Sequence, residues 1–129
     1  MAEMLKTTNY LACLLPDTPA TKGILDKSLF EKMPKGSFLL NAGRGNQLVE
    51  KDLTMALDNG QIKGAALDVF IVEPLPQNHP FWNDHRIIIT PHHAAEVFMP
   101  SAAKAFVENI ERVRSGQPLK GLVNQKVGY

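Results

Sequence analysis

The chain has 129 residues, enough for one domain, or part of one, with a hydrophobic core. Its formal net charge is +1 and it carries no basic stripe, so we expect neither a nucleic acid nor an anionic membrane as partner. No segment is apolar for long enough to span a bilayer, and we expect no signal peptide. The single cysteine, Cys13, cannot form a disulfide framework, which favours the reducing cytoplasm.

The first part of the chain is predicted to hold two short helices and two strands. Residues 4–5 end a helix, and residues 10–15 are continuously apolar, which predicts a buried strand. Residues 28–31 have capping-box spacing for a short helix, which the sequence Pro-Lys-Gly at residues 34–36 ends. Residues 37–41 form the second predicted strand.

The second part is predicted to hold two longer helices and two more strands. Residues 49–57 carry apolar side chains at helical spacing, and Gly60 follows as a C-terminal stop. Residues 64–69 and 86–90 form the third and fourth strands. A long helix then runs from Pro100 to the stop at Gly116. We expect its apolar stripe to pack in the core; the stripe is Ala103, Phe106, Val107, Ile110 and Val113.

The order of these elements predicts an α/β fold. Strands without polar alternation, separated by helices, are typical of a parallel sheet that helices cover on both faces. In such sheets, ligands bind beyond the carboxyl ends of the strands. Polar segments follow all four predicted strands, at residues 16–18, 41–45, 68–74 and 91–93. We therefore expect these four loops to converge on one edge of the sheet.

The loop NAGRG, residues 41–45, places Arg44 between two glycines directly after the second predicted strand. An arginine stays charged, and its planar fork suits a carboxylate or a phosphate. Glycine on each side permits unusual backbone torsions and the close approach of a ligand. Taken alone, the motif is weak and fits a solvated loop arginine better, but its place among four converging loops favours a binding site.

Three stretches stand in the order and spacing of one enzyme family: LLPDTPATKGIL at 14–25, the segment from FLLNAGRG to VEPLP at 38–76, and RIIITPHHAA at 86–95. With these motifs the chain resembles the NAD(P)-dependent D-isomer-specific 2-hydroxyacid dehydrogenases, from about Leu5 to its end. The NAGRG and EPLP contexts and residues 121–129 are most similar to the glyoxylate/hydroxypyruvate reductase branch. The resemblance implies a Rossmann-like sheet and reduction of a small 2-oxo acid by hydride transfer.

The resemblance assigns catalytic roles to three residues. Arg44 would hold the carboxylate and carbonyl oxygen of the substrate, and His92 would be the acid/base that protonates the carbonyl oxygen. Glu73 would orient His92 and favour its charged form. Each has a plainer interpretation when taken singly, because Glu73 also fits a surface loop acid and His92 a structural histidine. Likewise Asp68, which the resemblance assigns to the nicotinamide carboxamide, also fits a strand-end cap.

The resemblance implies NADP or NAD as the cofactor and a small 2-oxo or 2-hydroxy acid as the substrate. The residues it places along the cofactor are Thr18, Thr21, Ala42, Gly43, Arg44, Asp68, His92 and Ala95. No metal is expected, although His92 and His93 are adjacent and two histidines precede them. Adjacent side chains on extended backbone point apart, which disfavours shared ligation.

One expected feature is missing from these 129 residues, the Gly-x-Gly-x-x-Gly turn that receives the pyrophosphate. We expect residues 1–115 to be the C-terminal half of a NAD(P)-binding domain and residues 116–129 to be a tail that returns to a substrate domain. The chain would then be a fragment of an oxidoreductase and inactive alone. Its uncovered edge at residues 10–15 predicts a homo-oligomer. The alternative is a non-catalytic nucleotide-binding or scaffold module of the same fold family.

Overall fold

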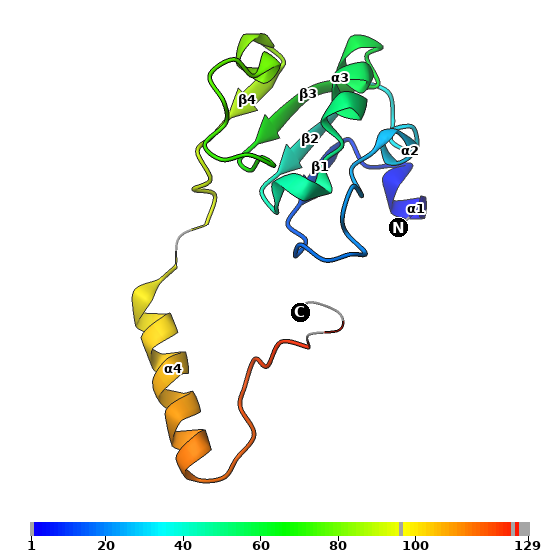
Figure 1. Ribbon diagram of the computed structural model, residues 1–129. Coiled ribbons are helices and arrows are strands. Elements are labelled where there is room, and N and C mark those ends of the chain that lie inside the picture. The colour runs from blue at the N-terminus through cyan, green and yellow to red at the C-terminus, as the bar shows by residue number, and fades with distance from the viewer. Residues whose placement is uncertain (1, 96, 125, 127–129) are drawn as a thin grey trace. The chain divides into compact units, whose positions relative to one another are not determined.

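The computed structural model describes residues 2–95, 97–124 and 126, and the chain divides between Ala94 and Ala95 into two compact units. The first unit holds four strands: β1 (Tyr10–Cys13), β2 (Ser37–Asn41), β3 (Ile62–Leu67) and β4 (Ile87–Ile89). Its helices are α1 (Ala2–Leu5), α2 (Lys27–Phe30) and α3 (Glu50–Asp58), with 3-10 turns η1 (Gly45–Gln47) and η2 (Pro80–Asn83). The second unit holds α4 (Met99–Arg114) (Figure 1).

The four strands form one parallel sheet in the order β1-β2-β3-β4, which confirms the predicted parallel sheet with flanking helices. Cys13 lies opposite Asn41, Asn41 opposite Leu67, and Leu67 opposite Ile89, so all four strands end at the same level. The loops that follow them therefore begin at one edge of the sheet (Figure 1). This edge carries the polar segments that the sequence analysis singled out.

Several predicted elements have different bounds in the structure. β3 runs over Ile62–Leu67 rather than residues 64–69, and β4 over Ile87–Ile89 rather than residues 86–90. β1 ends at Cys13 rather than at residue 15, because the carbonyl of Leu15 accepts a hydrogen bond from the Gln47 side chain at 2.8 Å instead of continuing the ladder. The second helix begins at Lys27, before the predicted capping box. Its N-cap is Asp26, whose carboxylate accepts from the backbone N–H of Leu29 at 2.9 Å.

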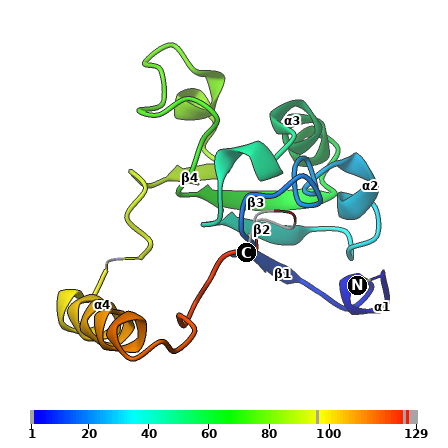
Figure 2. The ribbon, with the colours of Figure 1, turned by 60° about the horizontal axis from the view of Figure 1, so that its bottom comes forward.

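The core of the first unit lies on one face of the sheet, beneath α2 and α3 (Figure 2). Phe30 of α2, Leu53 of α3 and Ile62 of β3 are at most 1% exposed there. Leu39, Ala65 and Ile87, which are register neighbours, present the sheet side of this core.

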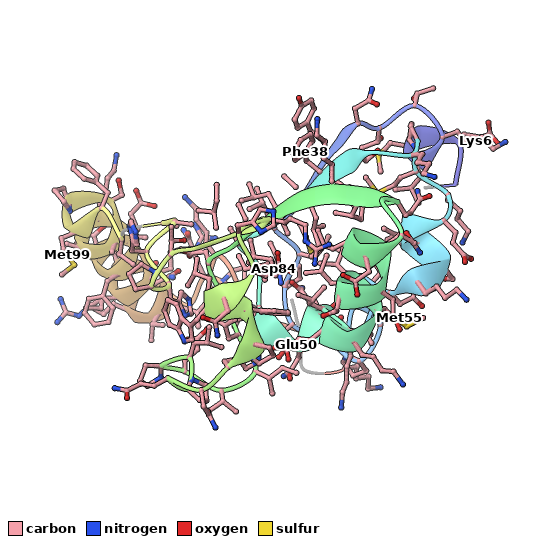
Figure 3. The ribbon with its side chains drawn as sticks, turned by 90° about the horizontal axis from the view of Figure 1, so that it is seen from above. Lys6, Phe38, Glu50, Met55, Asp84 and Met99 are labelled. Carbon is pink, nitrogen blue, oxygen red and sulfur yellow. The ribbon has the colours of Figure 1, made fainter. Side chains whose placement is uncertain are left out.

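The opposite face of the sheet is bare within the first unit, so the prediction of cover on both faces is wrong for this unit. Figure 3 shows Phe38 on the other side of the sheet from Glu50 and Met55 of α3. Phe38 stacks on Tyr10 at 5.2 Å between ring centroids, and Tyr10 is 77% exposed. Strand alternation places Leu40 and Ile88, 40% and 66% exposed, on that same face. The alternation is apolar on both faces, but α2 and α3 lie on only one of them.

The second unit consists of α4 and the segment after it. Pro100 lies in the first turn and Gly116, with φ +66°, follows the last turn, as predicted. The expectation that the apolar stripe packs in the core is wrong, because no residue of α4 is buried and Phe106 is 68% exposed. Among the described residues of this unit, the helix contacts the segment that follows it, where Asn109 exchanges hydrogen bonds with the backbone of Lys120 at 2.9 and 3.2 Å. One helix and a short segment cannot enclose an apolar stripe.

The predicted boundary between residues 115 and 116 stays a prediction, and the end of the predicted tail, residues 125 and 127–129, lies outside the described residues. The division into compact units falls earlier in the chain, at Ala94. In the ranges that the structure describes, no helix is both long and apolar enough to cross a membrane.

Candidate active site

Three loops at the carboxyl edge of the sheet bring the predicted catalytic residues together. Arg44 follows β2, Glu73 follows β3 and His92 follows β4, and all three line one hollow of about 160 Å³. The remaining residues that line it are Asp17, Gly45, Asn46, Phe70 and Ile71. The convergence that the sequence predicted at this edge is therefore found for all three residues, while their catalytic roles stay predictions.

His92 and Glu73 form a close pair, with 2.7 Å between Nδ1 of the imidazole and Oε2 of the carboxylate. The other carboxylate oxygen accepts from the backbone N–H of Phe70 at 2.8 Å. These hydrogen bonds, first that from His92 and then that from Phe70, lower the pKa of Glu73 below its usual value. An ionised carboxylate only accepts, so Nδ1 of His92 is the donor. Nε2 is then the ring atom that can exchange a proton with a ligand.

The backbone at His92 is left-handed, with φ 53°, so the expectation of extended backbone at residues 92–93 is wrong at this residue. Left-handed backbone is uncommon for a residue other than glycine and is found at functional sites where the surroundings enforce it. Here the surrounding hydrogen bonds come from Asp68. Its carboxylate accepts from the Thr90 hydroxyl and from the backbone N–H groups of His93 and Ala94, at 3.1 and 2.9 Å.

Asp68 is 3% exposed, and its pKa is lowered although burial acts to raise it. The hydrogen bonds from Thr90, Ala94 and His93 outweigh that burial. Asp68 thus anchors both sides of the loop that carries His92, a role that the sequence analysis did not foresee. Its predicted contact with the nicotinamide stays a prediction.

The two glycines around Arg44 serve the protein's own packing. Neither Gly43 nor Gly45 has a positive φ, so the expectation of unusual torsions is wrong here. A Cβ on Gly43 would lie 2.2 Å from Oε1 of Gln47, and one on Gly45 would lie 2.0 Å from the carbonyl carbon of Phe70. The second approach presses the loop after β2 against the loop after β3. Arg44 and Glu73 share one hollow for that reason.

Arg44 is exposed, and its Nη1 donates to the carbonyl of Gly43 at 2.7 Å. Over the described residues, no carboxylate lies close enough to Arg44 to form an ion pair. The guanidinium therefore retains N–H donors for an anionic ligand in the hollow.

The other predicted cofactor residues of the first unit lie at or near this edge, whereas Ala95 belongs to the second unit. Thr18 is 6% exposed and its hydroxyl lies 3.0 Å from that of Thr21, which donates to the carbonyl of Pro16 at 2.6 Å. These hydroxyls shape the loop after β1. The backbone N–H of Ala42 donates to the carbonyl of Cys13 at 3.1 Å. Ala95 begins the second unit, and cofactor contact stays a prediction for all four residues.

Sequence reasoning missed three side chains near the site. Trp82 is 51% exposed and lines a second hollow of about 600 Å³ that Glu73 and His92 also line. Asn41 and Gln47 are fully buried and hold the backbone of Arg44. A polar residue at a strand end gives a weak signal for Asn41, and nothing in the local pattern distinguishes Gln47. The described ranges contain no group of three or more His, Cys, Asp or Glu side chains that could hold a metal ion.

Comparison with known proteins gives the chain relatives along its whole length. Residues 1–94 match the model of the D-isomer specific 2-hydroxyacid dehydrogenase, NAD binding domain. Glyoxylate/hydroxypyruvate reductase A from Photorhabdus laumondii subsp. laumondii is 47% identical over 129 residues, which cover 100% of this chain and 41% of the relative. The corresponding reductase from Serratia proteamaculans is 45% identical over 99% of this chain and 41% of the relative.

Two solved structures show the same fold. A D-isomer specific 2-hydroxyacid dehydrogenase from Xanthobacter autotrophicus Py2, in complex with NADPH and MES, has a TM-score of 0.93 at 36% identity, over 99% of this chain and 53% of that one. An NADPH-dependent glyoxylate/hydroxypyruvate reductase from Sinorhizobium meliloti, in complex with NADP and sulfate, has a TM-score of 0.91 at 38% identity, over 99% of this chain and 42% of that one.

These matches confirm the resemblance to the family and the Rossmann-like fold class. The chain spans about 41% of the length of the curated relatives it matches. The family model ends at residue 94, where the first compact unit also ends, and so covers every residue of the hollow that holds Arg44, Glu73 and His92. The chain belongs to the NAD-binding-domain family of the D-isomer specific 2-hydroxyacid dehydrogenases.

Proposed function

We propose that this chain carries the catalytic residues of an oxidoreductase that reduces small 2-oxo acids, such as glyoxylate or hydroxypyruvate, with NADPH or NADH. The observation that carries the proposal is the His92–Glu73 pair, 2.7 Å apart, in one hollow with Arg44. An imidazole oriented by a carboxylate is suited to proton transfer near neutral pH, and a guanidinium is suited to an acid group. Two curated relatives bear the name of such a reductase.

In this proposal each residue has one task during reduction. Arg44 holds the substrate carboxylate in a bidentate grip, which orients the neighbouring carbonyl. His92, protonated at Nε2, gives that proton to the carbonyl oxygen while carbon accepts the hydride. Glu73 holds Nδ1 and stabilises the imidazolium before the transfer. The products are the 2-hydroxy acid, the oxidised cofactor and a neutral His92, which regains its proton from solvent.

A nicotinamide cofactor would supply the hydride, and the site has one unused acceptor that fits its carboxamide. Over the described residues, Oδ1 of Asp68 accepts two hydrogen bonds, whereas Oδ2 accepts one, from Ala94. A carboxylate oxygen has room for two, so Oδ2 can take a carboxamide N–H. Thr18, Thr21, Ala42, Gly43 and Ala95 are proposed to line the rest of the nicotinamide end. The pyrophosphate would be held by residues other than these 129, because their sequence contains no Gly-x-Gly-x-x-Gly turn.

A chimeric enzyme tests this function directly. In the chimera, the 129 residues of this chain replace the matching 41% of the Photorhabdus reductase. We expect the chimera to oxidise NADPH when glyoxylate is added, with the intact host enzyme as reference. A folded chimera that binds NADPH but turns over neither acid would overturn the proposal and support a non-catalytic nucleotide-binding module.

In the chimera, Arg44→Lys is expected to raise the KM for glyoxylate by about tenfold or more, because an ammonium cannot reproduce a bidentate grip. Initial rates at varied glyoxylate and saturating NADPH measure the change. Arg114→Lys, on the exposed last turn of α4, is the matched control and should leave KM unchanged. An unchanged KM and kcat in Arg44→Lys would remove the carboxylate-binding role.

We also propose that the protein assembles as a homo-oligomer in the cytoplasm. The support is β1, which lies at the edge of the sheet, and the bare apolar face around Tyr10 and Ile88, 77% and 66% exposed. Cys13 is buried and free, which suits a reducing compartment. Sedimentation velocity on the 129-residue chain should show self-association that rises with micromolar concentration, and Tyr10→Lys should weaken it. A stable monomer at every concentration would contradict the assembly.

A further inference from the structure

The side chain of Gln47 joins two loops at the carboxyl edge of the sheet. It is 0% exposed, and its Nε2 donates to the carbonyls of Leu15 and Pro16 at 2.8 and 3.1 Å. Its Oε1 accepts from the backbone N–H of Arg44 at 2.9 Å and from the thiol of Cys13 at 3.4 Å. One buried amide thus uses both its donor and its acceptor ends to tie the loop after β1 to the loop after β2.

Asn41 completes the hold on Arg44. It is also 0% exposed, its Nδ2 donates to the carbonyl of Arg44 at 3.2 Å, and its Oδ1 accepts from the N–H of Gly43 at 3.2 Å. The N–H of Arg44 goes to the Gln47 side chain, and the carbonyl of Arg44 also accepts from the backbone N–H of Gln47 at 3.2 Å. Two buried amides therefore engage both polar backbone groups of the residue whose guanidinium lines the hollow.

The surrounding chain is shaped to the Gln47 amide. Any side chain at Gly43 would displace it, because a Cβ there would lie 2.2 Å from Oε1. No other side chain of this size supplies a donor and an acceptor at these positions without charge. A methionine has a similar length, but it has no hydrogen-bond donor and only a weak acceptor. An ionised glutamate has no donor for the two carbonyls. Loss of the amide would leave the Leu15 carbonyl and the Arg44 N–H without these partners in a partly buried place.

We propose that Gln47, together with Asn41, is the positioning residue for Arg44, and that it sets where the guanidinium meets the substrate carboxylate. The inference rests on the proposed function, because it assigns that carboxylate to Arg44. Gln47 lines neither of the two hollows, so it would act through the backbone of Arg44. Its loss therefore changes substrate binding first, whereas the His92–Glu73 pair is held by other loops and keeps its geometry.

Gln47→Met in the chimera tests the proposal, with Gln61→Met as the matched control. Gln61 also bridges two backbone carbonyls with Nε2, those of Phe30 and Met33 at 2.8 and 2.9 Å, but it precedes β3, at the opposite edge of the sheet. We expect Gln47→Met to raise the KM for glyoxylate by about ten- to a hundredfold and to raise the KM for NADPH by a smaller factor. Gln61→Met should lower the melting temperature comparably and leave both KM values unchanged. Equal KM values in the two variants would overturn the proposal.

A second measurement does not require turnover. Phenylglyoxal modifies arginine side chains, and mass spectrometry of the 129-residue chain gives the rate at Arg44 relative to Arg114. Gln47→Met should raise that ratio at least about threefold, because Arg44 leaves its fixed place beside the Gly43 carbonyl. Gln47→Glu retains the acceptor for the Arg44 N–H and should give a smaller rise. If the ratio is unchanged in both, the positioning role fails; if it rises while the parent chimera is inactive, the proposed function fails and the hold on Arg44 stands.

Discussion

His92→Ala in the chimera is expected to lower kcat for glyoxylate reduction by about 10²–10⁴-fold, the range that general acid catalysis contributes. The variant removes the ring that faces Glu73 across 2.7 Å, and with it the group proposed to deliver the proton to the carbonyl oxygen. The KM for glyoxylate should move far less than kcat, because Arg44 remains in place to hold the carboxylate. Initial rates from NADPH absorbance, at saturating acid and cofactor, measure the decrease in kcat.

His93→Ala is the control for that experiment. His93 is the neighbouring histidine, its side chain is exposed, and the contact it makes with Asp68 comes from its backbone N–H, which alanine keeps. The control should retain kcat within about twofold of the parent. If the two variants have the same kcat, whether both keep the parent value or both lose activity, His92 is not the acid/base.

The gathering of the site loops at the carboxyl edge of the sheet could be predicted from sequence, because it follows from the local pattern of apolar residues. Continuous apolar runs at β2 and β3 predict parallel strands, and parallel strands end together, so Asn41 and Asp68 had to lie side by side. The place of Arg44, Glu73 and His92 at one edge follows from the same rule. The resemblance to the dehydrogenase family then assigned chemistry to residues that the fold had already gathered.

What could not be predicted depends on contacts between residues far apart in the chain. β1 ends at Cys13 because Gln47, 34 residues away from that cysteine, takes the carbonyl of Leu15. The glycine at 45 is required by the backbone of Phe70, and not by a positive φ. The left-handed backbone at His92 is enforced by hydrogen bonds to Asp68 on another strand end. None of these partners is visible in a local window of sequence.

The stripe on α4 marks a different limit of sequence reasoning. Apolar side chains at helical spacing predict which face seeks burial but not what buries it. Phe106 and Val113 are 68% and 63% exposed, so their burial requires a surface that the second unit does not itself provide. The sheet face at Tyr10 is likewise an apolar surface that its own unit leaves exposed. Both surfaces favour the proposed self-association.

The 129-residue chain alone is expected to show no measurable reduction of glyoxylate or hydroxypyruvate and at best feeble binding of NADPH or NADH. It carries His92, Glu73 and Arg44, but these lie on an open edge, with the His92 side chain 47% exposed. Holding the reactants in place supplies roughly 7–11 kcal/mol of the barrier, and closure excludes water. The 129 residues contain no Gly-x-Gly-x-x-Gly turn for the pyrophosphate, and within the described residues of the first unit the hollow stays open.

The assay follows NADPH and NADH absorbance with each acid at high protein concentration, and the His92→Ala form of the same chain is the blank. Cofactor binding is measured separately by titration calorimetry, where a dissociation constant weaker than about 1 mM corresponds to less than about 4 kcal/mol of binding free energy. Turnover above the blank would mean that copies of this chain rebuild a working site between them, since no single copy holds both reactants. That outcome would overturn the view of the chain as catalytically incomplete, and the dependence of rate on protein concentration would then identify the assembled form.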